Sequence, residues 1–187
     1  MINAVGRNIP EEVMAATGRD VFRGSYVNDN KEYIKAAPKV RGLCDPKRSK
    51  LIGSIHEAIV KCGVRDGMTL SFHHHFREGD YVLNTVMQEI HDMGIRDLTL
   101  CASSLGKAND AILPFIEDGT ITSIYSSGVR GKIGEAISNG KLKNIAVMYS
   151  HGGRVRAIEE GRIHIDVAFI GAPTADEYGN LRAVGGK

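Results

Sequence analysis

The sequence lacks the features that mark membrane, secreted or general nucleic-acid-binding proteins. No apolar run approaches the roughly 20 residues that span a bilayer, and residues 1–7 lack the apolar stretch of a signal peptide. The three cysteines, Cys44, Cys62 and Cys101, are scattered and odd in number, which favours a reducing compartment over a disulfide framework. The net charge is only +2, so electrostatics does not indicate a nucleic-acid or membrane partner. We therefore expect a cytoplasmic protein.

Motifs for covalent or nucleotide chemistry are missing as well. The sequence has no Gly-x-Ser-x-Gly nucleophile elbow and no P-loop. Gly128, Gly131 and Gly134 follow a Gly-x-x-Gly-x-x-Gly spacing, which differs from a nicotinamide-binding fingerprint. Cys101 lies in an expected strand, where a cysteine is usually a small core residue. No clearly paired carboxylates mark a catalytic dyad, so the sequence identifies no catalytic residue.

What the sequence does contain is an alternation of short apolar runs with helical segments. Residues 1–50 are polar and lack sustained periodicity, so we expect an N-terminal extension before a domain formed by residues 51–187. Strands are predicted at residues 68–72, 98–102, 121–125, 145–149 and 167–170. Helices are predicted at 51–62, from the N-cap Asp80 to residue 93, at 109–118 with an irregularity at Pro114, at 131–139 with Ser127 as N-cap, and before Gly161. The glycine-containing end at residues 181–187 leads us to expect one part of a longer polypeptide.

The alternation predicts an α/β fold with a mainly parallel sheet and helices on both faces. Because the predicted strands are apolar with little alternation, we expect both of their faces to be covered. In such sheets, ligands bind beyond the carboxyl ends of the strands. The loops that follow the predicted strands are therefore the places to look for functional residues.

Three histidines and an arginine follow the first predicted strand: His73, His74, His75 and Arg77. Neighbours on an extended chain point to opposite sides, so at most His73 and His75 share a face. No carboxylate or cysteine pair completes a metal-ligand spacing, and we expect no metal. We predict that one or two of these histidines bind an anion or carboxylate together with Arg77. The alternative is that they only line a loop.

The loops after the next three strands are further candidates for anion binding. Glycines allow close approach of the backbone, helix starts supply free N–H groups, and arginines supply paired donors. For the third loop, the alternative is a glycine-rich turn with solvated cations. The candidates are Ser103 and Ser104 after the second strand, Gly128, Arg130 and Gly131 after the third, and His151, Gly152, Gly153, Arg154 and Arg156 after the fourth.

Four stretches in this order resemble the α-subunit family of bacterial citrate lyase. They are residues 72–80 (FHHHFREGD), 127–137 (SGVRGKIGEAI), 150–154 (SHGGR) and 165–173 (IDVAFIGAP). The resemblance covers essentially the whole chain, including the NIPEE sequence that begins at Asn8. It implies a CoA-transferase fold related to ribose-5-phosphate isomerase, which occurs twice in tandem. This chain would be the first of the two domains, and the second would be absent from it.

The resemblance implies a citrate CoA-transferase. Such a subunit exchanges acetyl for citryl on the CoA-like thioester of an acyl carrier γ subunit, or on acetyl-CoA, without a covalent acyl-enzyme. A β subunit then cleaves the citryl thioester, within a homo- and hetero-oligomeric complex. The arginines Arg77, Arg130, Arg154 and Arg156 suit a tricarboxylate, and catalytic groups are expected beyond Lys187. The alternative is a non-catalytic module of the same fold that senses an anion or a sugar phosphate.

Overall fold

The computed structural model describes residues 1–24, 47–73 and 81–182. The chain divides into two compact units, Met1–Ile34 and Lys35–Lys187. In the described part of the first unit, Ile2 and Asn8 form an isolated antiparallel bridge. A short helix, α1 (Glu11–Thr17), ends at Gly18 in the left-handed conformation and buries none of its residues. This unit therefore contributes little hydrophobic core of its own.

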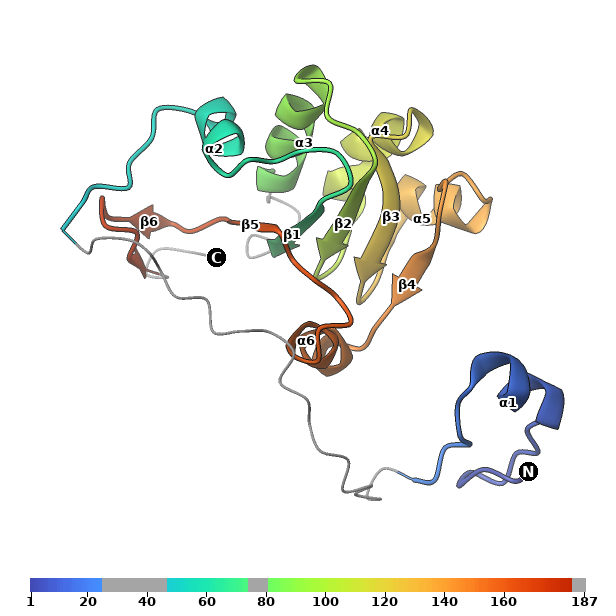
Figure 1. Cartoon of the computed structure of the whole chain (residues 1–187). Helices are drawn as coiled ribbons and strands as arrows, with labels where there is room; N and C mark the ends of the chain where they lie inside the picture. Colours follow the sequence, from blue (N-terminus) through green and yellow to red (C-terminus); the bar gives the residue numbers. More distant parts are fainter. Residues whose placement is uncertain (25–46, 74–80, 183–187) are drawn as a thin grey trace. The chain divides into compact units, whose positions relative to one another are not determined.

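The second unit is built around a five-stranded sheet in which every described pair is parallel (Figure 1). The strand order is β4-β3-β2-β1-β5. The strands are β1 (Thr69–His73), β2 (Leu98–Ala102), β3 (Ile121–Ser126), β4 (Ala146–Met148) and β5 (Val167–Ile170). The predicted mainly parallel α/β fold is confirmed. A small antiparallel pair, β6 (Thr174–Ala175) and β7 (Leu181–Arg182), was not predicted.

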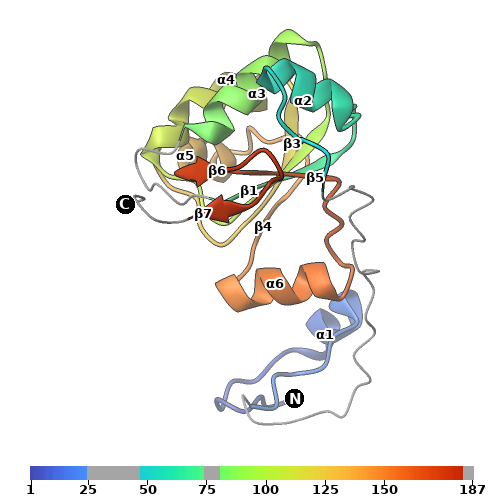
Figure 2. The same ribbon diagram turned by 90° about the vertical axis from the view of Figure 1, so that its left-hand side faces the viewer.

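The chain reverses its direction of travel across the sheet after β4. From β1 to β4 each strand is added on the same side, but β5 returns to pair with the other side of β1. Right-handed crossovers then require the β4–β5 helix to lie on the opposite face from the earlier helices. Figures 1 and 2 show this helix, α6, on the other side of the sheet from α3, α4 and α5. The helices are α2 (Ile55–Lys61), α3 (Val82–Asp92), the 3-10 helix η2 (Lys107–Ile112), α4 (Leu113–Glu117), α5 (Gly131–Ser138) and α6 (His151–Glu159).

The two faces of the sheet are buried unequally. Leu70, Leu100 and Ile124 belong to a large apolar core shared with α2 to α5 and η2, whereas a small cluster of Cys101, Ala157 and Ile163 lies beneath α6. Each fully buried aliphatic side chain of the large core contributes about 1.5–3 kcal/mol to folding.

The expectation that the strands are covered on both faces is wrong for β4 and β5. Met148 in β4 and Ile170 in β5 are 49% and 56% exposed, and Ile145, just before β4, is 64% exposed. Both strands lie at the edges of the sheet, where fewer neighbouring elements are available to cover them.

The first predicted helix begins four residues too early. The side chain of Ser54 accepts a hydrogen bond from the Glu57 amide, and the Glu57 carboxylate accepts one from the Gly53 amide. These contacts satisfy backbone donors at the start of α2, and Leu51 stays 71% exposed outside the helix. The apolar spacing that included Leu51 was therefore misleading.

Two predicted N-caps are also corrected. The N-cap position of α3 is Tyr81, whereas Asp80 was predicted and lies outside the described residues. The N-cap position of α5 is Arg130 instead of Ser127. The irregularity predicted at Pro114 is confirmed, because η2 gives way to α4 there and the proline occupies the first turn of α4. A proline is tolerated in a first turn because its missing N–H would be unpaired anyway.

Lys50 is attached to the turn between β6 and β7. Its amide donates to the carbonyl of Glu177, and its ammonium donates to the carbonyl of Tyr178, both at 2.6 Å.

Within the described ranges, no helix has the length and apolarity needed to cross a membrane.

Candidate functional site

A pocket lies at the carboxyl ends of β1 and β2, next to β5. This is where the chain reverses direction across the sheet, and open parallel sheets bind ligands at such points. Two predicted site residues, His73 and Ser104, are brought together there. The lining residues are Phe72, His73, Val82, Leu83, Ala102, Ser104, Asn109 and Phe169.

The walls of this pocket are fixed by ring stacking and by an amide network. The rings of Phe72 and Phe169 stack across the β1–β5 pair with their centroids 5.5 Å apart. Asn109 is 8% exposed; its amide nitrogen donates to Asn84, and its oxygen accepts from the Gly106 amide. The hollow measures only about 10 Å³, the space of about one water molecule, so it marks the position of a candidate site at the strand ends.

Arg154 reaches from α6 to the opposite face of the same strands. Its Nη2 donates to Ser71 Oγ at 3.0 Å and to the carbonyl of Cys101 at 3.2 Å. Its Nε is buried and has no hydrogen-bond partner, and no ion pair found among residues 1–24, 47–73 and 81–182 includes Arg154. Burial raises the pKa of the Cys101 thiol, while the nearby Arg154 acts in the opposite direction. Cys101 is a buried core residue, as predicted.

The other residues predicted in the fourth loop do not reach the sheet in the same way. His151 and Gly152 are exposed at the start of α6, and the Gly153 amide donates to the side chain of Ser150, the N-cap. Arg156 is exposed and pairs with Glu160 one turn later. Ligand binding by these residues stays a prediction.

The glycine-containing loop before α5 is bound by a carboxylate of the protein itself. Asp110 in η2 accepts a hydrogen bond from the Lys132 amide at 2.9 Å. Gly131 has φ +67°, and a Cβ there would lie 2.6 Å from the same carboxylate. The amide of Arg130 donates to Leu105, and Gly128 accepts from Leu105 through its carbonyl. An external anion would have to displace Asp110, so anion binding here stays a prediction.

The remaining predicted residues divide into two groups. Ser103 is 4% exposed, and its amide donates to the carbonyl of Phe72, which extends the β1–β2 ladder by one residue. His74, His75 and Arg77 lie outside the described residues. In the ranges that the structure describes, no three His, Cys, Asp or Glu side chains are grouped to hold a metal ion.

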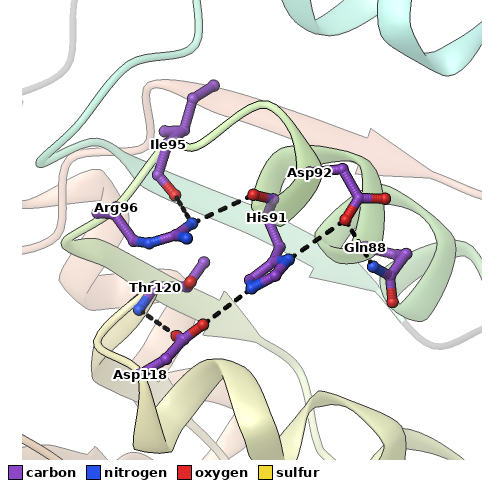
Figure 3. Close-up of polar contacts among 7 residues, drawn as sticks. All are labelled: Gln88, His91, Asp92, Ile95, Arg96, Asp118 and Thr120. Carbon is purple, nitrogen blue, oxygen red and sulfur yellow. Dashed lines mark hydrogen bonds and ion pairs between the residues drawn. The ribbon is translucent and has the colours of Figure 1, made fainter.

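A separate polar cluster lies at the amino ends of the strands, where α3 ends and β3 begins (Figure 3). The ring nitrogens of His91 lie 3.3 Å from Asp92 and 2.9 Å from Asp118. Burial raises the pKa of Asp118, but hydrogen bonds from Thr120 and the charges of Arg96 and His91 outweigh it, so the pKa is lowered. This cluster joins α3 to the end of α4 and lies far along the strands from the pocket.

Sequence reasoning missed three residues that shape the site. Ser71 is a polar residue between two apolar ones in β1, and this interruption of the apolar run is the signal that could identify it. Asn109 contacts Asn84, 25 positions away, and Asp110 contacts Lys132, 22 positions away, and the local sequence gives no sign of these two contacts.

The parallel sheet and the reversal beside β1 define an open, parallel α/β domain. Its family follows from sequence similarity. The family model "Citrate lyase, alpha subunit (CitF)" matches residues 48–187, and the chain belongs to this family. The resemblance identified from the sequence motifs is thereby confirmed.

Curated relatives agree with this assignment. The citrate lyase alpha chain of Haemophilus influenzae is 46% identical over 172 residues, which cover 91% of this chain and 34% of that relative. The citrate lyase alpha chain of Klebsiella pneumoniae is 45% identical over 151 residues, or 81% of this chain and 30% of that relative. The chain thus spans about a third of the length of the curated relatives it matches.

A solved structure supports the fold. The putative alpha subunit of citrate lyase from Streptococcus mutans, crystallised in complex with citrate, superposes with a TM-score of 0.83 at 46% identity. The match covers 99% of this chain and 35% of that chain.

Proposed function

We propose that this chain forms the first domain of a citrate CoA-transferase in the citrate lyase complex. The observation that carries the proposal is Arg154: a guanidinium beneath α6 with a buried, unpaired Nε and no carboxylate partner among the described residues, beside a pocket at the carboxyl ends of the strands. A carboxylate-bearing substrate would supply the missing charge. The family assignment supports citrate as that substrate.

The proposed reaction exchanges two acyl groups on one thiol. A citrate carboxylate oxygen attacks the acetyl thioester carbonyl, the C–S bond breaks, and a mixed anhydride and a thiolate result. The thiolate then attacks the citryl carbonyl of the anhydride, and acetate leaves with the bridging oxygen. No protein nucleophile is required, and the buried Cys101, with its raised pKa, is unsuited to be one.

The protein's contribution in this scheme is to position the reactants and stabilise charge. Holding the carboxylate and thioester together replaces a bimolecular encounter, and fixed donors stabilise the oxyanion that forms at the carbonyl. The thioester arm belongs to an acyl carrier γ subunit or to acetyl-CoA. A β subunit then cleaves the citryl thioester, so we expect a hetero-oligomer that acts in citrate metabolism.

A thioester-exchange assay tests the proposal. This chain is incubated with citrate and acetyl-CoA, and citryl-CoA and acetate are followed by mass spectrometry; the Haemophilus influenzae alpha chain is run in parallel as a longer relative. Exchange by this chain would establish that the residues present here suffice. Citrate binding without exchange by either protein would instead favour the non-catalytic sensing module.

A further inference from the structure

We propose that residues 150–163, which contain α6, form a lid that opens from the sheet while the rest of the second unit stays folded. Arg154 is the latch that sets how often this lid opens. Such a lid goes beyond the proposed function: it would exist whether or not the chain transfers acyl groups, and it can be tested without citrate or a thioester. The packing of α6, the surface beneath it and the contacts of Arg154 all point to it.

α6 is packed much more loosely than α3 on the other side of the sheet (Figure 2). Of the nine residues of α6 only Ala157 is buried, whereas α3 buries four of its eleven. The buried cluster beneath α6 consists of Ala157, Cys101 and Ile163. Separating a helix from a sheet costs free energy in proportion to the apolar area that becomes exposed, so α6 opens at a lower cost than α3.

The sheet surface beneath α6 is polar. Ser71 and Cys101 face α6, and because strand residues alternate between the two faces, Thr69 and Thr99, two positions earlier, share this surface. Both threonines and Ser71 are half-buried. The opposite face of the sheet carries the fully buried aliphatic side chains of the large core. Hydroxyl groups bond to water when a covering helix moves away, so opening of α6 leaves a surface that solvent can hydrate.

The segment is fixed to the sheet at both of its ends. On one side the Tyr149 amide donates to the carbonyl of Ser126 at 2.8 Å. On the other side Asp166 bonds to Thr69 through its amide and through its carboxylate. Between these two points, amides that begin and end α6 bond within the segment itself. The segment can therefore move as one body between two fixed ends.

Arg154 joins the middle of this segment to the sheet. Its Nη2 donates to Ser71 Oγ at 3.0 Å and to the carbonyl of Cys101 at 3.2 Å. Its Nε is buried without a partner among the described residues, and an unpaired buried donor makes the closed position less favourable. Opening breaks the two Nη2 bonds, hydrates Nε and releases the guanidinium. The lid thus controls when this cation can meet an anion in solution.

The competing explanation is that α6 leaves the sheet only when the whole domain unfolds. The thiol of Cys101 distinguishes the two, because it is fully buried beneath α6 and reacts with a disulfide reagent only when it is uncovered. Cys62 is exposed, so Cys44 and Cys62 are both replaced by serine to leave a single thiol. A local opening exposes little surface and responds weakly to urea, whereas global unfolding responds steeply.

The experiment measures the rate at which DTNB labels Cys101 in this chain at urea concentrations below the unfolding transition. Each rate is divided by that of the same variant unfolded in urea, which removes differences in thiol reactivity. Low reagent concentrations are used, so that the opening equilibrium and not the opening rate is measured. We expect labelling that is nearly independent of urea and faster than global unfolding allows. Labelling that depends on urea as steeply as global unfolding does would overturn the proposal.

Variants of the latch should open the lid more often. Arg154→Met removes both hydrogen bonds and should raise the labelling rate about 10- to 100-fold, whereas Ser71→Ala removes one acceptor and should raise it about 3- to 10-fold. Arg162→Met is the control: Arg162 pairs with Glu160 inside the same segment, so opening leaves the pair intact, and the rate should change by less than about 2-fold. If Arg154→Met labels no faster than Arg162→Met, Arg154 is not the latch.

A matched pair of conservative substitutions tests whether the opening is local. Ile163, between the lid and the sheet, and Ile90, in α3, are 2% and 0% exposed. Ile163→Val and Ile90→Val should each shift the global unfolding equilibrium by about 2- to 12-fold. Only Ile163→Val should raise Cys101 labelling by that factor, because the contacts of Ile90 persist while the lid is open. Equal increases in the two variants would overturn the lid. Circular dichroism and thermal melting establish that each variant is folded before labelling.

Discussion

Replacing Asp110 with alanine tests whether the start of α5 is held by an internal carboxylate. The side chain bonds the Lys132 amide at 2.9 Å and lies against Gly131, so it acts as a cap supplied by η2. Loss of a side-chain cap costs about 1 kcal/mol, and loss of a negative charge at a helix start adds roughly 0.3–1 kcal/mol. We therefore expect Asp110→Ala to lower the free energy of unfolding by about 1–2 kcal/mol, or roughly 2–8 °C in Tm for a domain of this size.

The same variant should also open an anion site. With the carboxylate removed, the α5 amides become available, and helix starts bind sulfate or phosphate. Thermal melts are recorded with increasing sulfate for the unsubstituted chain, Asp110→Ala and Asp110→Asn. Glu117→Ala serves as a control that removes one exposed negative charge from the adjacent α4. Sulfate should raise the Tm of Asp110→Ala more than that of the other three.

Two results would refute this reasoning. An Asp110→Ala variant as stable as Glu117→Ala would show that the contact with Lys132 contributes nothing to folding. A reduced Tm with no additional response to sulfate would show that the glycine loop does not bind anions even when it is vacant. The second result would also remove the main support for ligand binding by Gly128, Arg130 and Gly131.

Three further predictions concern stability. Gly131→Ala should lower the free energy of unfolding by at least about 1–2 kcal/mol, because the φ of Gly131 is +67°. In the Asp110→Ala background the same substitution should cost less in urea unfolding, because the clash between the new Cβ and the Asp110 carboxylate is gone. The cost of the positive φ should remain there. The pKa of Asp118 is lowered in the folded state. The stabilisation that its carboxylate provides is therefore present above the pKa of the unfolded chain, about 3.9, and is lost as the pH falls through the pKa of the folded state. Asp118→Asn should make the decline of Tm in acid less steep, and an unchanged decline would contradict this. Ile124→Ala should cost about 2–5 kcal/mol in urea unfolding, whereas Ile145→Ala, at an exposed edge, should change stability by less than about 0.5 kcal/mol; similar losses would mean that the core is misplaced.

The local sequence pattern predicts the bounds of a strand correctly where a buried apolar run is flanked directly by polar residues or glycine. The predicted bounds of β2 and β5 agree with the structure because both are short apolar runs followed or preceded by polar residues and glycine. Apolar spacing failed at Leu51, since an exposed apolar residue and the first turn of a helix look alike in sequence. The informative signal there is Ser54 followed three residues later by Glu57, the sequence pattern of a capping box, although Glu57 accepts from the Gly53 amide and not from that of Ser54.

Tertiary contacts account for what the sequence could not predict. The start of α5 was assigned a cap by the nearest hydroxyl, Ser127, whereas the carboxylate that binds its amides comes from Asp110 in another element. The side chain of Arg154 was predicted to bind an anion, but nothing local indicates that it crosses to Ser71, 83 positions earlier. The strand order, which creates the pocket beside β5, is likewise a property of the folded sheet.

The return of β5 to β1 also sets the order in which the sheet can form. Strands β1 to β4 pair with neighbours in sequence, but the bond from the Thr69 amide to Asp166 joins residues 97 positions apart. Such long-range pairings form slowly, because chain entropy is lost before contacts compensate for it. During synthesis, β1 therefore remains an open edge with unpaired backbone groups, a template for association with other chains. Pairing of β5 with β1, with Phe169 stacked on Phe72, closes that edge, so the same step also completes the hollow at the carboxyl ends of the strands.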